Sequence, residues 1–581
     1  MRAECRVRLI GWDEPWDESN CSVSWACRIE GMSRPAAFIL SLTLAINLPG
    51  TPAAQQAVVP VVSGESSVSG TRIRADVEFL ADDLLEGREA ATRGHELAAR
   101  YAAASLKAAG YAPGADDGTY FQQVPFIEST ATATAMRVTV NGATGDIAIP
   151  DEAIVAPSAA HATAEVTAPV VFAGFGVTAP QFGYDDYAGL DVKGKIVVVL
   201  SNAPATLPSE PRAVFASGDH KLKNAADHGA VAMVTMLSPE DLKRLPWGQM
   251  KLYFSRPTLT WANADGTPGP TEKRLKALAY LNPQGAARLF VGSPLTFEQA
   301  VTTGKTGVPG GKALASTLTI SSTTSHKRTQ SPNVVAVLKG TETALASTSV
   351  VLTAHLDHTG IRPSGEGDRI NNGAYDNATG SAIMLEVARA LAAASPRPKR
   401  TVVVALVTAE EKGLLGSDYF AHMPVKAAGR IVANVNLDMP VFLFPSRDIV
   451  AFGAENTTLD AVVRKAVGDL GYTLSPDPLP DENVFVRSDQ YSLVKQGVPA
   501  VYLMPGLTAI DPAVNGQQVF GAFLSTHYHK PSDDTSQPMD LAAVEKFTRA
   551  NLAVVRAIAD DPVDPAWKPG NFFGKMFGGT R

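Results

Sequence analysis

The chain has 581 residues, of which 45% are hydrophobic and 19% are charged, and its formal net charge is −7. These values are typical of a globular protein that is long enough for several domains. The negative net charge and the lack of a long basic run argue against a nucleic-acid partner and against binding to an anionic membrane surface.

An apolar run near the N-terminus has the features of a secretory signal. It extends from Ala36 to Leu48, follows Met32 and one arginine, and precedes small and polar residues. It is shorter than the ~20 residues of a comfortable membrane span, although a membrane anchor or a buried helix is the alternative. We therefore predict a signal peptide at 32–56, no stable membrane span after cleavage, and export to the periplasm or the extracellular space. Residues 1–31 would then be an upstream mis-start.

Cysteine usage agrees with this interpretation. All three cysteines of the chain precede Met32. An exported chain that begins after the signal would therefore contain neither disulfides nor thiolate chemistry.

The next segments differ in their hydrophobic patterns. Residues 57–71 are rich in Val, Ser and Gly and are expected to form a linker. A helical pattern then extends to Ala109, with Gly110 as a stop signal, and opens the N-terminal part of a catalytic domain at 72–159. Residues 160–325 contain short β-rich runs separated by Gly, Pro and Asn, which predicts a compact inserted domain.

From Asn333 onward, strands and helices alternate. Strands are predicted at 333–338, 348–354, 401–408, 431–437 and 499–504, and helices at 378–394, 413–421, 457–471, 488–496 and 540–559. This alternation predicts an α/β fold with a mostly parallel central sheet flanked by helices, in a domain that spans 326–562. A C-terminal tail at 563–581 follows, and we expect it to lie loosely on the surface.

Acidic and histidine residues follow several of these strands. His355, Asp357, Asp376, Glu410, Glu411, Asp438 and His529 each lie at a strand end or in a loop next to a helix. In an open α/β sheet, ligands bind beyond the carboxyl ends of the strands, so we expect these side chains to gather at one edge.

Such a cluster favours a site for two divalent metal ions. Buried carboxylates repel one another strongly unless cations balance them, and imidazole with carboxylate ligands suits zinc. Asp376 lies between glycines that permit close approach, and it is our choice for a carboxylate that bridges the two ions. Asp357 is placed to hold the His355 imidazole. Of Glu410 and Glu411, one should bind metal and the other should accept a proton from water.

The stretches AHLDHTG, NNGAYDNATGSAIMLEVARAL, TAEEKGLLGS, NVNLDMP and HYHKPSDD together make the chain recognisable. The chain resembles the M28 family of metallopeptidases, the co-catalytic zinc aminopeptidases with an inserted protease-associated domain. The stretch VVFAGFGVTAPQFGYDDYAGLDVKGKIVVVL is similar to the start of that inserted domain, and the segment from Arg74 to Pro113 is similar to the family's N-terminal segment. The fold implied is that of the zinc exopeptidases.

The resemblance implies specific roles. One zinc would be held by His355, Asp376 and Asp438, and the other by Asp376, Glu411 and His529. Glu410 would be the general base, and Asp357 would orient His355. The family pattern selects His529, not His527, because His529 precedes Lys-Pro-Ser-Asp. We expect His358 to support the ligands and not to be a ligand itself.

A segment near the substrate pocket of the family is also recognisable, and it places Ser488, Asp489 and Tyr491 near the substrate.

The function predicted is hydrolysis of peptides by a chain with two Zn²⁺ ions, with removal of N-terminal residues favoured. A carboxypeptidase or dipeptidase on the same site is the alternative, and glutaminyl cyclases share the scaffold. A non-catalytic receptor on a peptidase scaffold predicts lost ligands, and none is lost. The oligomeric state is open, and we hypothesise that the inserted domain covers the site.

Overall fold

The computed structural model describes residues 67–307 and 310–580. The predicted mis-start at 1–31, the predicted signal peptide at 32–56 and most of the predicted linker lie outside these residues. The described residues all belong to the second of the two units into which the chain divides, Val59–Arg581. Among them, no helix is both long enough and apolar enough to cross a bilayer.

The predicted helical segment at the start of the described chain is confirmed, and it is broken into pieces. Helix α1 covers Gly70–Leu80, a 3₁₀ turn covers Asp83–Arg88, and α2 covers Arg93–Ala108. The Ser69 side chain accepts a hydrogen bond from the Arg72 amide and so caps α1. Helix α2 ends at the predicted place, because Gly110 has a φ of 94° that side chains disfavour.

The C-terminal region contains the predicted sheet. Its strands lie in the order β19, β18, β20, β17, β13, β16 and β12. The bounds are Thr473–Ser475, Asp448–Phe452, Ala500–Pro505, Arg430–Asn436, Thr348–His355, Thr401–Val407 and Lys312–Leu338 in that order. Strand β13 pairs in parallel with β16 and β17, and β17 pairs in parallel with β20. Strands β12 and β18 run antiparallel to their neighbours β16 and β20, so the sheet is mixed around a parallel centre.

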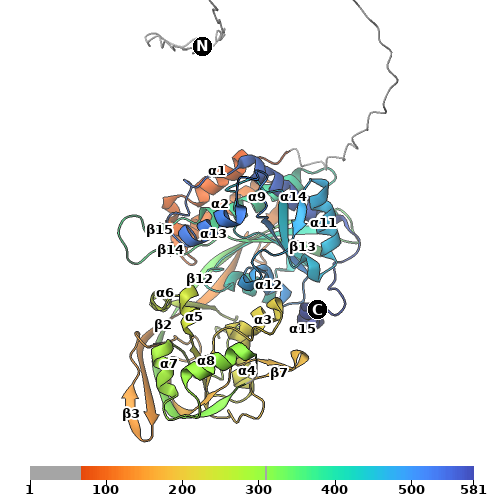
Figure 1. Cartoon of the computed structure of the whole chain (residues 1–581). Coiled ribbons are helices and arrows are strands. Elements are labelled where there is room, and N and C mark those ends of the chain that lie inside the picture. The colour runs from red at the N-terminus through yellow and green to blue at the C-terminus, as the bar shows by residue number, and fades with distance from the viewer. Residues whose placement is uncertain (1–66, 308–309, 581) are drawn as a thin grey trace, which may run out of the picture. The chain divides into compact units, whose positions relative to one another are not determined.

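Helices cover this sheet as predicted. They are α9 (Thr379–Ala393), α10 (Leu415–His422), α11 (Leu459–Asp469), α12 (Gln490–Val494) and α14 (Leu541–Asp560). Helix α9 packs against β13, α1 and α14, which lie around it in Figure 1, and it is buried along most of its length. The structure adds α13 (Gly516–Thr526) and strands β18 and β19, which the sequence patterns did not predict.

The inserted region continues the same sheet. Strands β5 (Thr163–Phe172), β8 (Ile196–Leu200), β9 (Ala232–Met236) and β11 (Ala277–Leu281) are parallel neighbours, and β4 (Ala153–Val155) closes the edge in antiparallel orientation. Strand β12 connects the two regions, because its first part pairs with β5 and its last part with β16. It also pairs over its length with the long strand β2 (Phe121–Val140). One backbone element is therefore common to both regions (Figure 1).

Six helices belong to the inserted region. They are α3 (Ser209–Ala216), α4 (Gly218–Asp227), α5 (Pro239–Arg244), α6 (Trp247–Phe254), α7 (Pro283–Leu289) and α8 (Phe297–Thr306). The region has an apolar core of its own, in which Val198 and Val234 are fully buried. Met136, Ile147 and Val155 pack in this core, although the sequence assigned them to the preceding domain.

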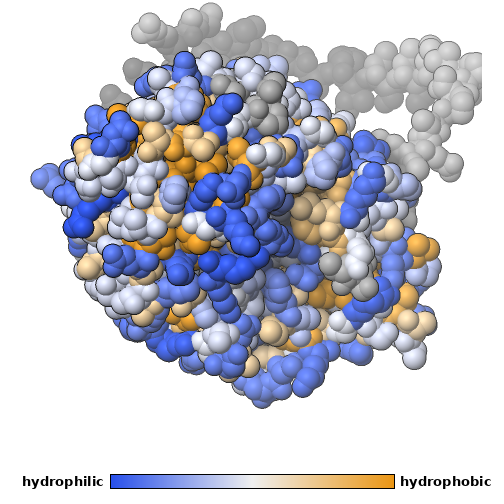
Figure 2. Space-filling model, turned by 90° about the horizontal axis from the view of Figure 1, so that it is seen from below, coloured by the Kyte–Doolittle hydropathy of each residue, from blue (hydrophilic) through white to orange (hydrophobic). Residues whose placement is uncertain are grey.

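The surface carries few large apolar side chains. Figure 2 shows one face of the molecule, on which hydrophilic residues surround smaller hydrophobic patches. Leu245 and Tyr253 of the inserted region are about half exposed, at 48% and 51%. Isolated exposed apolar residues are normal, and of these two only Tyr253 lines a cavity.

The C-terminal tail is packed, and the expectation of a loose surface segment is wrong. Helix α15 (Phe572–Phe577) buries Phe573 completely, against Phe485 and Trp567. The ring of Phe572 lies 5.9 Å from that of Phe215 in the inserted region. Burial of Phe573, with the partly buried rings of Phe572 and Phe577 beside it, is the physical reason that this short helix docks.

Candidate metal centre

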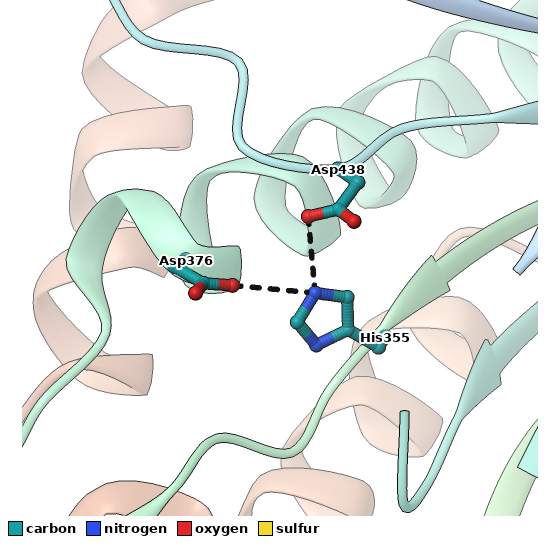
Figure 3. A group of neighbouring side chains, drawn as sticks. All are labelled: His355, Asp376 and Asp438. Atoms are coloured by element: carbon teal, nitrogen blue, oxygen red, sulfur yellow. Dashed lines mark hydrogen bonds and ion pairs between the residues drawn. The ribbon is translucent and has the colours of Figure 1, made fainter. Parts of the chain in front are cut away.

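Three predicted ligands meet at the carboxyl end of the sheet. His355 is the last residue of β13, Asp438 follows β17, and Asp376 lies in the turn Ala374–Ala378 before α9. The Nε2 atom of His355 lies 3.1 Å from Oδ1 of Asp438 and 3.4 Å from Oδ1 of Asp376. Figure 3 shows both carboxylates pointing at the same imidazole nitrogen.

A second group forms around the other oxygen of Asp376. The Nε2 atom of His529 lies 3.2 Å from Oδ2 of Asp376 and 3.2 Å from Oε2 of Glu411. His358 is also present, with Nδ1 2.7 Å from Oε1 of Glu411 and 3.8 Å from Oδ2 of Asp376. Asp376 therefore faces both groups, as a bridging carboxylate requires.

The backbone turns sharply where it delivers these side chains. Ala409, Met439 and His529 have φ values of 56°, 43° and 56°, in the left-handed region that non-glycine residues rarely adopt. Two of them adjoin predicted site residues, and the third is itself a predicted ligand. Such conformations persist where the surrounding structure enforces them, and they concentrate at functional sites.

The side chains fit divalent metal ions. Ligand atoms of His355, Asp376 and Asp438 all lie within 4.8 Å of one another, and so do those of His358, Asp376 and Glu411. Ligands ~2.0–2.2 Å from a tetrahedral zinc ion lie roughly 3.3–3.6 Å from one another, close to the separations observed here. The Asp376 and Glu411 side chains are only 4% and 7% exposed, so their charges need partners.

Imidazoles and burial compete in setting the protonation of the cluster. Burial raises the pKa of Asp376, but His358, His355 and His529 outweigh it and hold this pKa well below the ordinary value. Burial lowers the pKa of His355 and of His529, but the neighbouring carboxylates raise both well above the ordinary value. The Asp376 carboxylate is therefore charged, which is the form that binds metal, and the imidazoles around it favour the protonated form that balances this charge.

Glu410 differs from its neighbour Glu411. Burial raises the pKa of Glu410 well above the ordinary value, and the charges of Asp438 and Glu411 add to this effect while His355 opposes it. For Glu411, burial also raises the pKa, but His529 and His358 reverse the shift and lower it. The Glu411 carboxylate is thus paired with imidazoles, whereas the Glu410 carboxylate is disposed to take up a proton.

Asp357 has a different role from the one predicted. Its carboxylate does not hold the His355 imidazole, whose Nδ1 lies 3.1 Å from the backbone carbonyl of Asp357. The carboxylate instead accepts hydrogen bonds from the backbone amides of Glu410 (3.1 Å) and Glu411 (3.4 Å). Asp357 therefore orients the imidazole with its main chain and the Glu410–Glu411 segment with its side chain.

Two supporting residues were missed by sequence reasoning. The Asp533 carboxylate accepts from the amides of Tyr375 (2.9 Å) and Asp376 (3.0 Å) and fixes the turn that carries Asp376. Asn377 donates to the Leu437 carbonyl (3.0 Å) and accepts from the Met439 amide (3.2 Å) on either side of Asp438. The only local signal for Asp533 was its place in the HYHKPSDD stretch.

Arg88 is a third supporting residue that sequence reasoning missed. It is 1% exposed, and its guanidinium donates to the carbonyls of Leu356 (3.0 Å), Asn372 (2.6 Å) and Gly373 (3.0 Å). Burial lowers the pKa of Arg88 to about 10, although Asp533 and Asp376 oppose this shift. A lone arginine between two helices carries no sequence signal of such burial.

The three predicted substrate-pocket residues separate in the structure. Ser488 lines a cavity of about 390 Å³ next to Asp438, together with apolar residues. Asp489 is fully buried, and burial raises its pKa to about 6. Tyr491 does not line this cavity, because its ring faces Phe577 of α15, 6.3 Å away, and this part of the prediction is corrected.

Comparisons with known proteins address the class of the protein. Residues 333–555 match the sequence profile of peptidase family M28. A probable zinc metalloprotease of Leptosphaeria maculans is 35% identical over 115 residues, which cover 18% of this chain and 24% of the relative. Leupeptin-inactivating enzyme 1 of Streptomyces exfoliatus is 26% identical over 204 residues, which cover 34% and 45%. The chain thus spans less than half of the length of either relative.

Among solved structures, an aminopeptidase from Aneurinibacillus sp. strain AM-1 aligns with 87% of this chain and 98% of its own, at 18% identity and a TM-score of 0.49. A zinc aminopeptidase from Bacillus subtilis aligns with 86% of this chain and 97% of its own, at 16% identity and a TM-score of 0.41.

The fold and the cluster of histidines and carboxylates at its strand ends together indicate the class of protein. A mixed sheet with a parallel centre carries histidines and carboxylates at one edge, and the matched residues run from the last part of β12 into α14. Residues 333–555, which contain all of the predicted metal ligands, are similar to peptidase family M28.

Proposed function

We propose that this protein is an exported zinc aminopeptidase that removes N-terminal residues from peptides with the help of two zinc ions. The observation that carries the proposal is the pair of ligand groups around Asp376, with Glu410 beside them. The zinc is supported by the imidazole and carboxylate donor set and by the names of the relatives. Export is supported by the apolar run from Ala36 to Leu48.

The chain's residues divide between the two ions. His355, Asp438 and Asp376 would hold one ion, and Asp376, Glu411 and His529 would hold the other. His529 is preferred to His358 because its Nε2 lies equally close to two carboxylates, whereas the short contact of His358 is a single bond to Glu411. His358 then positions Glu411, as a residue that orients a ligand does.

The residues support hydrolysis by an activated water molecule. Bound zinc would supply a Lewis acid that lowers the pKa of a water molecule and polarises the scissile carbonyl. Glu410 takes the proton of this water and passes it to the leaving amine, for which its raised pKa is suited. Asp357 holds the amide of Glu410 and so fixes where this base stands.

The cavity beside Asp438 favours a free N-terminus. Its wall is largely apolar and includes Met439, Phe452 and Phe520, with the Asp438 carboxylate at the metal centre. At about 390 Å³ it accommodates one large apolar side chain, and the carboxylate can hold the adjoining substrate amine. We propose that peptides with a large apolar first residue are preferred.

The test uses purified protein that begins near residue 57, with bound zinc measured per chain. Hydrolysis of one peptide is compared with that of its N-acetylated and its C-amidated forms. Two zinc ions, with activity lost only on N-acetylation, are expected. Loss only on C-amidation would instead establish the carboxypeptidase, and loss on both the dipeptidase. No zinc and no hydrolysis after metal addition would leave the binding-module alternative.

A further inference from the structure

A second cavity adjoins the metal centre on the side away from Asp438. It has a volume of about 580 Å³, and Glu411 and His529 of the ligand cluster line it. The inserted region supplies much of the remaining wall, including Tyr253 and Arg256. Tyr528 lines this cavity and the apolar cavity as well, so the two flank one centre.

The wall of this second cavity is strongly basic. It carries five cationic side chains, namely Arg244, Arg256, Arg362, Lys412 and Lys530. Among the residues that the structure describes, Glu411 is the only carboxylate in the wall, and the proposed function assigns it to a metal ion. The apolar cavity is the opposite, since Asp438, Asp477 and Glu482 outnumber Arg487 there. The excess of charged side chains is therefore basic in one cavity and acidic in the other.

Two of the five cationic side chains already have hydrogen-bond or ion-pair partners within the protein. Arg256 donates to the carbonyls of Thr359 (3.1 Å) and Ile361 (2.9 Å) and thereby joins the inserted region to the wall. Lys412 pairs with Glu89 at 2.6 Å. These contacts explain the presence of both residues without any ligand.

The remaining three cations are less committed. Arg362 is exposed, and its guanidinium has no hydrogen-bond or ion-pair partner within the described parts of the chain. The Arg244 contact with Asn202 is long, at 3.4 Å, and Lys530 donates to the Ser525 carbonyl, which leaves its other donors available. Glu366 and Asp368 lie on the same loop as Arg362 but do not line the cavity.

We propose that this basic cavity binds a carboxylate on the leaving side of the substrate. The carboxylate is either the free C-terminus of a short peptide or an acidic side chain just after the first residue, and the same guanidinium and ammonium groups suit both. The inference rests on the proposed function, because that function sets the first residue in the apolar cavity. The proposed subsite gives the inserted region a role in substrate selection. The position of this region alone only suggested such a role.

The test compares matched peptides that differ only in charge. Leu-Ala-Ala is compared with its C-terminal amide, and Leu-Glu-Ala amide with Leu-Gln-Ala amide. We expect kcat/KM to be about three- to tenfold higher for the charged member of at least one pair. Preference in the first pair identifies the C-terminus, and preference in the second identifies the side chain. The preference should shrink as salt is raised toward 1 M, because the cavity is open to solvent.

Two variants connect the preference to the cavity. Arg362→Gln, and Arg362→Gln combined with Arg244→Gln, should reduce the charged-to-neutral ratio by about two- to fivefold. Arg369→Gln is the matched control, because Arg369 lies at the other end of the same loop, is exposed and does not line the cavity. It removes the same charge and should leave the ratio unchanged.

Binding by chelated protein separates this inference from the proposed function. The same pairs are titrated by calorimetry, where no turnover occurs. Tighter binding of the charged peptides without hydrolysis on metal addition would support the subsite and refute the aminopeptidase. Hydrolysis of all four peptides at equal kcat/KM would support the aminopeptidase and refute the subsite. An equal effect of the Arg362→Gln and Arg369→Gln variants on the charged-to-neutral ratio would also refute the subsite.

Discussion

The peptidase region and the inserted region bury parallel strands in one sheet, but they use buried carboxylates differently. In the inserted region, Asp186 accepts from the amides of Phe175 (2.9 Å) and Val177 (3.1 Å) and from the Tyr184 hydroxyl (2.8 Å). In the peptidase region, Asp376 and Asp438 instead face an imidazole and each other's charge. A buried carboxylate whose oxygens meet backbone donors holds a loop, whereas carboxylates that face one another need a cation.

The regions also differ in the residues at or just beyond the ends of their strands. His355 is the last residue of β13, and Glu410 and Asp438 lie shortly after β16 and β17, with left-handed backbone at Ala409 and Met439 beside them. Strands β8 and β9 lead into Ser201 and Leu237, which offer no metal-ligand set. The same strand architecture is therefore a scaffold in one region and a site in the other, and the side chains at the strand ends decide which.

The largest effect is expected from Glu410→Gln in the peptidase region. Loss of the proton acceptor should lower kcat by about 10²–10⁴ while both zinc ions remain bound. Steady-state kinetics and metal analysis measure the two quantities. Glu342→Gln is the control, because Glu342 is exposed in a turn away from the centre. A variant that lost zinc, or that kept its kcat, would contradict the division between Glu410 and Glu411.

Three histidine variants sharpen the description of the ligand groups. His529→Ala should lose one zinc ion per chain, because its nitrogen adjoins two carboxylates. His358→Ala should keep both ions at saturating zinc but weaken affinity by about 10–100-fold, as expected of a residue that orients a ligand.

The control for this series is His527→Ala, since His527 contacts Ser532 and lies outside both ligand groups. Zinc content and zinc titrations distinguish the variants. Loss of an ion in His358→Ala but not in His529→Ala would reverse the two assignments.

Phe573→Ala tests how far the two regions depend on the C-terminal helix. Removing this fully buried ring should destabilise the docked helix by about 3 kcal/mol, because a cavity remains between Phe485 and Trp567. Limited proteolysis of the tail and the thermal midpoint report the effect. Met576→Ala is the control, since Met576 is 37% exposed. Equal protease sensitivity of the two variants would mean that the helix does not depend on Phe573.

Lys221→Met gives the smallest effect and concerns the inserted region alone. Burial lowers the pKa of Lys221 from 10.5 to about 7, so the folded state binds fewer protons than the unfolded state between these values. The wild-type free energy of unfolding should therefore rise with pH in this window. The variant lacks this gain, and its stability relative to wild type should fall by about 2 kcal/mol from pH 7 to pH 9.

Thermal or denaturant unfolding at several pH values measures this difference. Lys223→Met is the control, because Lys223 is exposed on the same helix and pairs with Asp227 at the surface. A pH-independent difference between Lys221→Met and wild type would show that Lys221 does not titrate as its burial requires.

Much of the fold and of the candidate site follows from the sequence. The strands 348–354, 401–408 and 431–437 correspond to β13, β16 and β17, since continuous runs of buried β-branched residues are typical of central parallel strands. Strand β18 was missed because its five residues follow a Pro- and Ser-containing turn and resemble a loop. Helix α13 was missed because Gly and Gln at its start weaken the helical pattern.

By itself the sequence determined which side chains stand at the strand ends, because strand periodicity is local and the parallel order places these ends together. Only the tertiary structure decided that Asp357 holds the Glu410–Glu411 backbone, that Arg88 is buried under the Asp376 turn, and that a second imidazole adjoins Glu411. Only the tertiary structure brings Arg244 and Arg362 into one cavity. These are contacts between segments far apart in the chain, and residue patterns carry no information on the distance between such segments until the chain has packed.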